Sequence, residues 1–445
     1  MGALECSGND HGALTEIDNS MNRRNFIQST TAAAAGALAA PGTTHAAGAV
    51  PLGRAEHCVM LWLGGGMSQI DTFDPKAPGD AKGKKAGSYY PSIETSVPGV
   101  NVCEHLSKTA KQMEHITAVR SLHHDVVDEH AAAANRMHTG RPTSGTVTYP
   151  SLGSIIAHKR GAAAEGVPAY VLLGYPNIAR GSGFLGPEAG FIYSTDIGSG
   201  PAGLAQPKWL SSDRVARRKE LLKAVRDGGA ERFAGDKKFT DYDAALQESL
   251  RLSGPGFMEV FNLDSESADL RNAYGSEFGQ RCLLTRRLFQ AGVRFVEVSY
   301  SDNFKNGTGW DTHNDGQLKQ HLLIQDLDSA ISTLITDLDS HGLLDKTVIL
   351  INSEFGRPGN FDSGGGRGHQ SKVFTNVIAG GGLNHKGAWG ASNEISEEIA
   401  DKPVSVPDFF ATALAAMQID PNENLYDGDR PVPITDLGKP IAALF

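Results

Sequence analysis

The sequence is poor in cysteine and has no block of charge of one sign, and each shortage excludes a class of protein. Its 445 residues include four cysteines without paired spacing, so neither a disulfide framework nor a structural zinc knot is indicated. The formal charge of −10 is spread along the chain without a basic block, which gives nucleic-acid binding no support. The remainder, 40% hydrophobic and 21% charged, is typical of a globular protein.

Sequence motifs of three common enzyme classes are also missing. We find no Gly-x-Ser-x-Gly elbow, no phosphate-binding P-loop and no dinucleotide fingerprint. Acyl-ester hydrolysis, nucleotide triphosphate chemistry and hydride transfer are therefore disfavoured.

The N-terminal region has the pattern of an export signal. Arg23 and Arg24 are followed by Phe26 and by an Ala-rich apolar stretch over 29–40, which is too short for a permanent membrane span. Small residues at 44–46 follow, where a signal peptidase would cleave. An Ala-rich tail without such a role is the alternative, but the paired arginines favour export by the twin-arginine machinery to the periplasm or the exterior.

About 400 residues remain after this signal, enough for one large α/β domain. Short apolar runs such as 57–63, 293–300 and 347–351 alternate with helical patterns, including a long amphipathic one over 316–341. This alternation predicts an α/β fold with a largely parallel sheet. We expect an extension over 1–20 ahead of a true start at Met21, a signal peptide over 21–46, and a single domain over 47–445 with a helical insertion around 208–290.

Several connecting segments also carry predictions. Residues 76–112 are expected to form an excursion on the surface, and 174–207 a long loop at the rim of a pocket. Helical spacing predicts one helix over 266–290 and another near 393–400. The two loops would determine the substrate, but their sequences carry no interpretable chemistry.

Polar side chains follow four of the predicted strands. They are Ser68 with Asp71, His124 with Asp125 and His130, Asp311 with His313, and Glu354 with Arg357 and His369. Because parallel strands place their carboxyl ends at one edge of a sheet, we expect these groups to converge. Ordinary loop residues and helix caps are the alternative explanation for each group taken alone.

The mixture of residue types indicates a metal. Carboxylates combined with imidazoles suit zinc first, with manganese, iron or calcium as further candidates. Such a divalent metal would polarise a phosphoryl or sulfuryl oxygen and lower the pKa of water to about 7. The planar guanidinium of Arg357 suits two oxygens of a tetrahedral anion.

Several segments, taken in this order, resemble a known family. They are the twin-arginine start, Leu63 to Asp74, His138-Thr139-Gly140, Trp310 to His313, Ser353 to Arg357, and Gly366 to His369. Over about residues 23–440 the chain resembles the exported bacterial family called domain of unknown function 1501, which is grouped with the alkaline phosphatase and sulfatase superfamily. The resemblance implies a three-layer α/β/α sandwich with a metal-dependent site at the sheet edge.

The chain departs from the superfamily pattern at two positions. Gly65 stands where phosphatases carry an aspartate, which Asp71 could replace by reaching back from its loop. His130 stands where a serine, a threonine or a formylglycine-forming cysteine is expected, and no Cys-x-Pro-Ser-Arg signature is present. Either His130 attacks directly, or a metal-activated water attacks, or hydrolysis has been lost.

The leading hypothesis is an exported metal-dependent hydrolase of phosphate or sulfate esters, acting on a small molecule or a glycan. The alternative is a non-catalytic exported module that binds a glycan or a partner in the same cleft. In the first case His130 and Arg357 are catalytic, Ser68 and Arg357 bind substrate, and the metal ligands are Asp71, His124, Asp311, His313, Glu354 and His369.

Overall fold

The computed structural model describes residues 50–445, apart from 205–208, 253–254, 301–304 and 306. Contacts group Val50–Phe445 into one unit. The extension expected over 1–20 and the signal peptide expected over 21–46 lie outside the described residues. Among the described helices, none combines the length and the apolarity that a membrane crossing needs.

A nine-stranded sheet lies at the centre of the described chain, in the order β10-β4-β9-β8-β1-β7-β5-β6, with β13 paired to β4. The strands are β1 (His57–Trp62), β4 (Ile116–His123), β5 (Tyr170–Leu173), β6 (Ile192–Ser194), β7 (Phe295–Ser299), β8 (Thr347–Asn352), β9 (Phe374–Gly380), β10 (Gly387–Trp389) and β13 (Val404–Ser405). β9 runs antiparallel to its neighbours β4 and β8. The other described pairings of this sheet are parallel.

Alternate residues of the central strands supply two hydrophobic cores, one on each face of the sheet. In β1, Val59 and Leu61 pack into one core, whereas Met60 and Trp62 pack into the other. Every residue of β1 and of β8 is buried, as the continuous apolar runs predict for strands covered on both faces.

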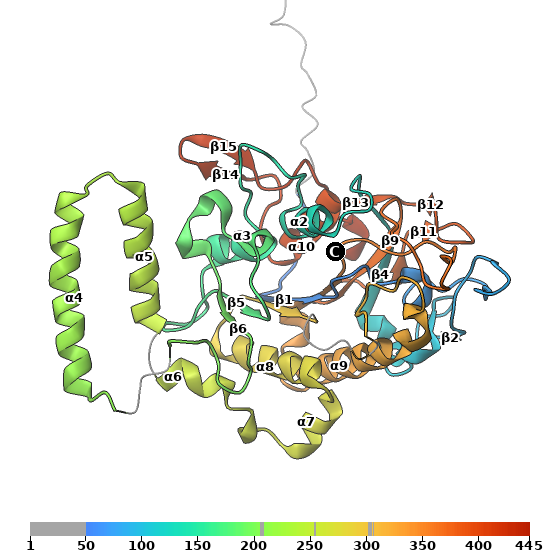
Figure 1. Cartoon of the computed structure of the whole chain (residues 1–445), viewed down its shortest axis with the longest axis horizontal. Helices are drawn as coiled ribbons and strands as arrows, with labels where there is room; N and C mark the ends of the chain where they lie inside the picture. The colour runs from blue at the N-terminus through green and yellow to red at the C-terminus, as the bar shows by residue number, and fades with distance from the viewer. Residues whose placement is uncertain (1–49, 205–208, 253–254, 301–304, 306) are drawn as a thin grey trace, which may run out of the picture. The chain divides into compact units, whose positions relative to one another are not determined.

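Helices cover both faces (Figure 1). One layer contains α7 (Ala268–Tyr274), α8 (Glu277–Ala291) and α9 (Gln320–Ser340), and the other contains α2 (His130–Thr139), α3 (Leu152–Arg160) and α10 (Val406–Ala416). The predicted three-layer α/β/α sandwich with a mostly parallel sheet is confirmed.

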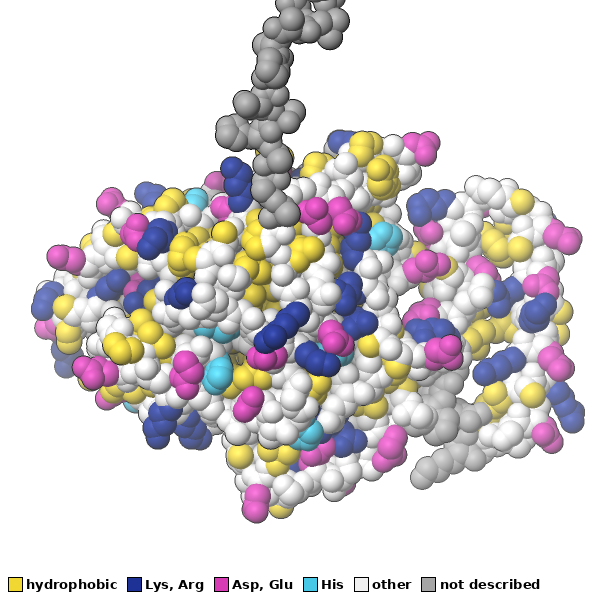
Figure 2. All heavy atoms as spheres, turned by 180° about the vertical axis from the view of Figure 1, so that it is seen from behind, with side chains coloured by type: hydrophobic (Ala, Val, Ile, Leu, Met, Phe, Trp, Pro, Cys, Tyr) yellow, Lys and Arg dark blue, Asp and Glu magenta, His cyan; other side chains and the backbone are white. Residues whose placement is uncertain are grey.

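The insertion between β6 and β7 is helical. It begins with α4 (Ser212–Arg232), α5 (Lys237–Leu252) and α6 (Pro255–Met258) and continues into α7 and α8. None of the residues of α4 is buried. Residues of α5 and of the 181–204 segment line a cleft of about 1270 Å³, where a pocket rim was expected. Acidic and basic side chains are intermixed over the face shown in Figure 2.

Two predictions of secondary structure were wrong. The helix expected over 266–290 is two helices, because Gly275 ends α7 with a φ of +80°. The helix expected near 393–400 is instead a turn between β11 (Ala391–Ser392) and β12 (Ile399–Asp401), in which Ser396 has a φ of +56°. A left-handed residue ends any helix, and apolar spacing does not reveal it.

Two further segments form small antiparallel hairpins. The 76–112 excursion contains β2 (Ser92–Glu94) paired with β3 (Asn101–Cys103), and the C-terminal tail contains β14 (Asn424–Asp427) paired with β15 (Arg430–Pro433). The excursion is more than a surface loop, since Val102 and Leu106 are fully buried. The Lys-, Gly-, Ser- and Pro-rich composition of the segment does not indicate this burial.

A buried ionic cluster lies on the face of the sheet that α2 and α3 cover. Glu297, in the middle of β7, accepts a hydrogen bond from the Arg180 guanidinium and lies 3.3 Å from Nε2 of His138. The Tyr170 hydroxyl donates to it at 3.1 Å. Burial opposes ionisation of Glu297, but Arg180 and His138 outweigh it and lower the pKa of Glu297 to about 2.

We expect Glu297→Gln to show, through the pH dependence of unfolding, how much the ionised Glu297 carboxylate contributes to stability. A depressed carboxyl pKa contributes stability that is present above the unfolded-state value of 4.5 and is lost as the pH falls towards 2. The free energy of unfolding of the variant should therefore differ most from that of the native chain above pH 4.5. Urea denaturation at several pH values measures this difference, and a constant difference between pH 5 and pH 2 would contradict the prediction.

Candidate metal centre

Four segments reach the same edge of the sheet. β1, β4, β7 and β8 are parallel in direction and end there, so the residues that follow them share that edge. Because β9 returns antiparallel beside β8, the connection over 353–373 begins and ends at this edge as well. The topology therefore gathers His130, Asp311, His313, Glu354, Arg357 and His369.

Three side chains present ligand atoms to one another. His130, Asp311 and His369 each offer one such atom, and these atoms lie within 4.8 Å of one another. Nε2 of His130 lies 3.7 Å from Oδ2 of Asp311, and Nε2 of His369 lies 3.8 Å from Oδ1 of Asp311. Tetrahedral zinc with bonds of about 2.0–2.2 Å places its ligand atoms about 3.3–3.6 Å apart, so small adjustments would suffice.

His313 lies beside this trio. Its Nε2 is about as far from atoms of two members as two ligands of one metal are from each other. Its Nε2 is 3.0 Å from Nε2 of His369 and 3.3 Å from Oδ1 of Asp311. A proton or a cation has to lie between two imidazole nitrogens at such a separation, because their lone pairs repel. Nε2 of His130 is buried and makes no hydrogen bond to any described residue. The donor set therefore fits a divalent metal.

Each of the three histidines has a carboxylate near its other ring nitrogen. Nδ1 of His130 lies 2.7 Å from Oε1 of Glu354, and Nδ1 of His369 lies 2.7 Å from Oδ1 of Asp128. Nδ1 of His313 lies 3.9 Å from Oδ2 of Asp362. Of these three contacts, the one between His130 and Glu354 is a hydrogen bond, and a carboxylate bonded in this way fixes the ring orientation of a metal-binding histidine.

The electrostatics of the site favour a cation. The carboxylates of Asp311 and Glu354, one near each ring nitrogen, raise the pKa of His130 to about 9. Burial opposes ionisation of Asp311, but His130, His369 and Arg357 together hold the pKa of Asp311 well below its usual range. Burial, followed by the charge of Arg357, lowers the pKa of His313. A cation would compete with the proton on His130.

Arg357 is fully buried, and its donors point at protein atoms. Nη2 donates to Oδ1 of Asp311 at 2.5 Å and to the Gly65 carbonyl. Nε donates to the Gly66 carbonyl at 3.0 Å, and Nη1 donates to the carbonyls of Arg367 and Gly368 at 2.9 and 3.2 Å. All five N–H groups are used, so this arrangement offers none to a substrate anion.

Asp71 lies in a separate buried network. Its carboxylate accepts from Nε and Nη2 of Arg367 at 2.7 and 3.0 Å, and from the Tyr89 backbone N–H at 2.7 Å. Gln317 and the Ser68 hydroxyl also donate to it. Asp71, expected to reach back to a metal, therefore lies apart from the trio and holds the loop that carries His369.

Ser68 and His124 are likewise committed to the protein. Ser68 is fully buried and donates to Asp71 at 2.7 Å, so it is not exposed to a substrate. Nε2 of His124 lies 2.6 Å from the Glu354 carbonyl oxygen, and its Nδ1 accepts from the Val126 N–H at 3.1 Å. Both ring nitrogens of His124 are thus engaged with backbone, which leaves it no free nitrogen for a metal.

Gly65 explains the missing aspartate of the superfamily pattern. Its φ is +119°, and a Cβ placed there would lie 2.6 Å from the Asp311 backbone nitrogen. Its own N–H donates to Oε1 of Glu354 at 2.8 Å. A side chain at this position would displace Asp311, so the glycine belongs to the arrangement of the site.

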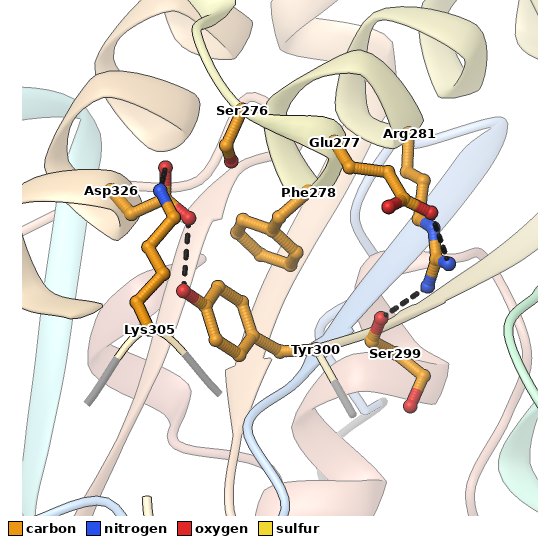
Figure 3. Close-up of a pocket in the computed structure, with 8 residues that line it drawn as sticks. All are labelled: Ser276, Glu277, Phe278, Arg281, Ser299, Tyr300, Lys305 and Asp326. Carbon is orange, nitrogen blue, oxygen red and sulfur yellow. Dashed lines mark hydrogen bonds and ion pairs between the residues drawn. The ribbon is translucent and has the colours of Figure 1, made fainter. Parts of the chain in front are cut away.

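A small pocket of about 40 Å³ lies at the end of β7, where the segment leading to Asp311 departs (Figure 3). The Tyr300 hydroxyl donates to Asp326 at 2.9 Å, and Lys305 lies 2.8 Å from the same carboxylate. The Tyr300 ring packs edge-on against Trp310 at 5.8 Å. Tyr300 thus contacts both Asp326 and Trp310, the residue before Asp311.

The sequence did not reveal three residues that contact the candidate site or hold its loops, namely Asp128, Asp362 and Arg367. Asp128 lies in the histidine-rich segment, but the sequence does not show which of its three acids faces a histidine. Arg367 lies between two glycines, a composition that predicts an exposed loop, yet its side chain is fully buried. Its guanidinium stacks over Phe361 at 4.1 Å, a contact between residues six apart in an irregular loop.

Comparisons with known proteins place the chain in context. Residues 55–445 match the model of a family described as "Protein of unknown function (DUF1501)". No curated protein matches the chain. Similar solved structures include a sulfatase from Pseudoalteromonas sp., with 11% identity, 82% of this chain and 68% of that chain covered, and a TM-score of 0.36.

Two other similar structures have different described activities. The lipoteichoic acid synthase from Listeria monocytogenes has 10% identity, with 86% of this chain and 76% of that chain covered and a TM-score of 0.38. The alkaline phosphatase from the Antarctic bacterium TAB5 has 13% identity, with 83% and 99% covered and a TM-score of 0.39.

We expect Asp71→Asn to destabilise the chain by about 3–5 kcal/mol, because it leaves the buried Arg367 without its charge partner. Asp345→Asn is the matched control. It breaks an ion pair with Arg54 whose side chains are 67% and 66% exposed, and such pairs contribute about 0–1 kcal/mol. Urea denaturation of the metal-free variants gives both values, and similar small losses for the two would refute the assignment.

Proposed function

The chain belongs to the DUF1501 family, proteins of unknown function, and from the geometry of its site we propose that it is a metal-dependent hydrolase of phosphate or sulfate esters. One observation carries the proposal: ligand atoms of His130, Asp311 and His369 lie within 4.8 Å of one another at the carboxyl edge of the sheet. The order of sequence motifs resembles that of a family grouped with the alkaline phosphatase and sulfatase superfamily, and this grouping supports the substrate class.

The proposed metal ligands are His130, Asp311 and His369, and His313 lies beside them. Three protein ligands with an open position are typical of catalytic zinc sites, and two histidines with one carboxylate are a common set. When bound, a divalent cation would act as a Lewis acid towards an ester oxygen and lower the pKa of water to about 7. Glu354 then orients His130 through Nδ1 rather than binding the metal itself.

Water is the proposed nucleophile. His130 lies against Glu354 on one ring nitrogen and faces Asp311 with the other, which disfavours direct attack by its imidazole. The water oxygen would bond to phosphorus or sulfur while the bond to the ester oxygen breaks, and the proton that the water loses ends on the departing oxygen. Arg357 acts on this chemistry through Asp311, whose carboxylate it holds at 2.5 Å.

A second candidate is the non-catalytic exported module, and a specific observation favours it. Ser68 and Arg357, the residues expected to bind substrate, are both buried and bonded to the protein. Turnover of nitrophenyl phosphate, nitrophenyl sulfate or a phosphodiester by the zinc-loaded protein, lost in His130→Ala, supports the enzyme. Glycan binding that survives removal of the metal, without turnover, supports the module.

We expect stoichiometric metal in the native chain and its loss in His369→Ala and Asp311→Ala. His313→Ala should weaken zinc binding without abolishing it, because the trio of ligands remains. His158→Ala is the control, since it removes an exposed imidazole from α3, outside the cluster. Metal analysis after dialysis against zinc measures each variant. Equal zinc content in native chain and His369→Ala would end the proposal.

Export by the twin-arginine route is proposed from residues 21–46 alone. We expect replacement of Arg23 and Arg24 by lysines to leave the precursor in the cytoplasm, because the machinery reads the arginine pair. The same double replacement at Arg217 and Arg218 should not affect export. Cell fractionation measures both, and equal export of the two variants would contradict the prediction.

A further inference from the structure

The loop between β4 and α2 carries an acid that no sequence motif singles out. Oδ1 of Asp128 lies 2.7 Å from Nδ1 of His369, across 241 residues of sequence, as an ion-pair contact whose angle is not that of a hydrogen bond. The Asp128 side chain is 79% exposed, whereas that of His369 is 10% exposed. Asp128 thus reaches the cluster from the solvent side and contacts a ring whose other nitrogen faces Asp311 and His313.

We propose that Asp128 is a positioning residue, which holds His369 by Nδ1 so that Nε2 is the nitrogen presented to the metal. The inference rests on the proposed metal centre for its effect on metal affinity. The contact itself, and the tautomer it selects, are properties of the metal-free chain.

The loop is pinned on both sides of Asp128. On the β4 side, His124 makes contacts with the Glu354 carbonyl and the Val126 N–H. On the α2 side, Glu129 caps the helix, and its carboxylate accepts from the N–H groups of Ala131 at 2.9 Å and Ala132 at 2.5 Å. His124 was predicted to bind the metal. These contacts give it a different role, because they hold the loop that positions Asp128.

The backbone at Asp128 is in the left-handed region, with a φ of +64°. Most residues disfavour this conformation by about 1–2 kcal/mol, although aspartate and asparagine tolerate it better than most. The contacts of His124 and Glu129 on either side therefore hold a backbone conformation that directs the Asp128 carboxylate towards His369. A conformation of this kind, held by contacts on both sides, is typical of positions that serve a site.

The contact decides between two tautomers of His369. A neutral imidazole has one N–H, and the negative charge of the Asp128 carboxylate beside Nδ1 favours the proton on that nitrogen. Nε2 of His369 then carries a lone pair, directed at Nε2 of His313 at 3.0 Å. This is the form in which His369 binds a metal through Nε2.

Asp128→Gly tests the proposal, because glycine accepts the left-handed backbone while removing the carboxylate. The affinity for Zn²⁺, measured by competition with a chromophoric chelator, should fall about 10- to 100-fold. Asp128→Asn keeps an oxygen acceptor without the charge and should lose less. In the metal-free protein, ¹⁵N NMR of labelled histidines should show His369 moving from the Nδ1–H towards the Nε2–H form in Asp128→Gly.

Asp125→Gly is the matched control, because it makes the same replacement in the same loop at an acid that lies 3.8 Å from Arg136. It should leave both zinc affinity and the His369 tautomer unchanged. Native zinc affinity and an unchanged tautomer in Asp128→Gly would overturn the inference while leaving the metal centre intact. If the native chain binds no zinc, the metal centre fails, and the tautomer of the metal-free protein decides the role of Asp128.

Discussion

The arrangement of the site depends on one buried, positively charged side chain, that of Arg357. The guanidinium of Arg357 has no access to solvent, so each of its N–H groups needs a protein acceptor. It finds them in the glycine turn after β1, in the backbone of the 367–368 segment, and in Asp311. Three loops that are far apart in sequence are thereby fixed relative to one another by a single side chain.

A second buried arginine repeats the pattern in the same loop. Arg367 pairs with Asp71 and donates to the carbonyls of Pro358, Gly359 and Gly87. Both arginines of the 357–367 loop are therefore spent on holding loops rather than on facing a ligand. In the proposed enzyme, the positive charge that meets an anionic substrate comes from the bound cation.

Much of the fold follows from the sequence, because it rests on continuous apolar runs. The runs over 57–63, 293–300 and 347–351 contain β1, β7 and β8, and the pattern over 316–341 contains α9. The expectation that strand ends share one edge also brought together Asp311, His369 and His130, although their roles stay predictions. These inferences need the identity and the order of residues, and both are present in the sequence.

The rest depends on side-chain direction, which spacing does not encode. Asp71 was predicted to bind a metal and Arg357 a substrate anion, because acids and arginines that follow strands commonly have these roles. Whether such a group faces the cavity or the protein depends on loop torsions and on distant partners, as with Arg367 and Asp71, which are 296 residues apart. Likewise, the ring nitrogen that a histidine presents depends on what contacts the other one, as Glu354 does for His130.

The reversed direction of β9 has a consequence for how the molecule comes apart. The segment that carries Glu354, Arg357 and His369 is tethered at both ends to adjacent strands at the middle of the sheet. Its two anchors separate only if β8 and β9 unzip, and those strands are wholly buried. The two ends of this segment therefore stay side by side for as long as the buried centre of the sheet stays folded.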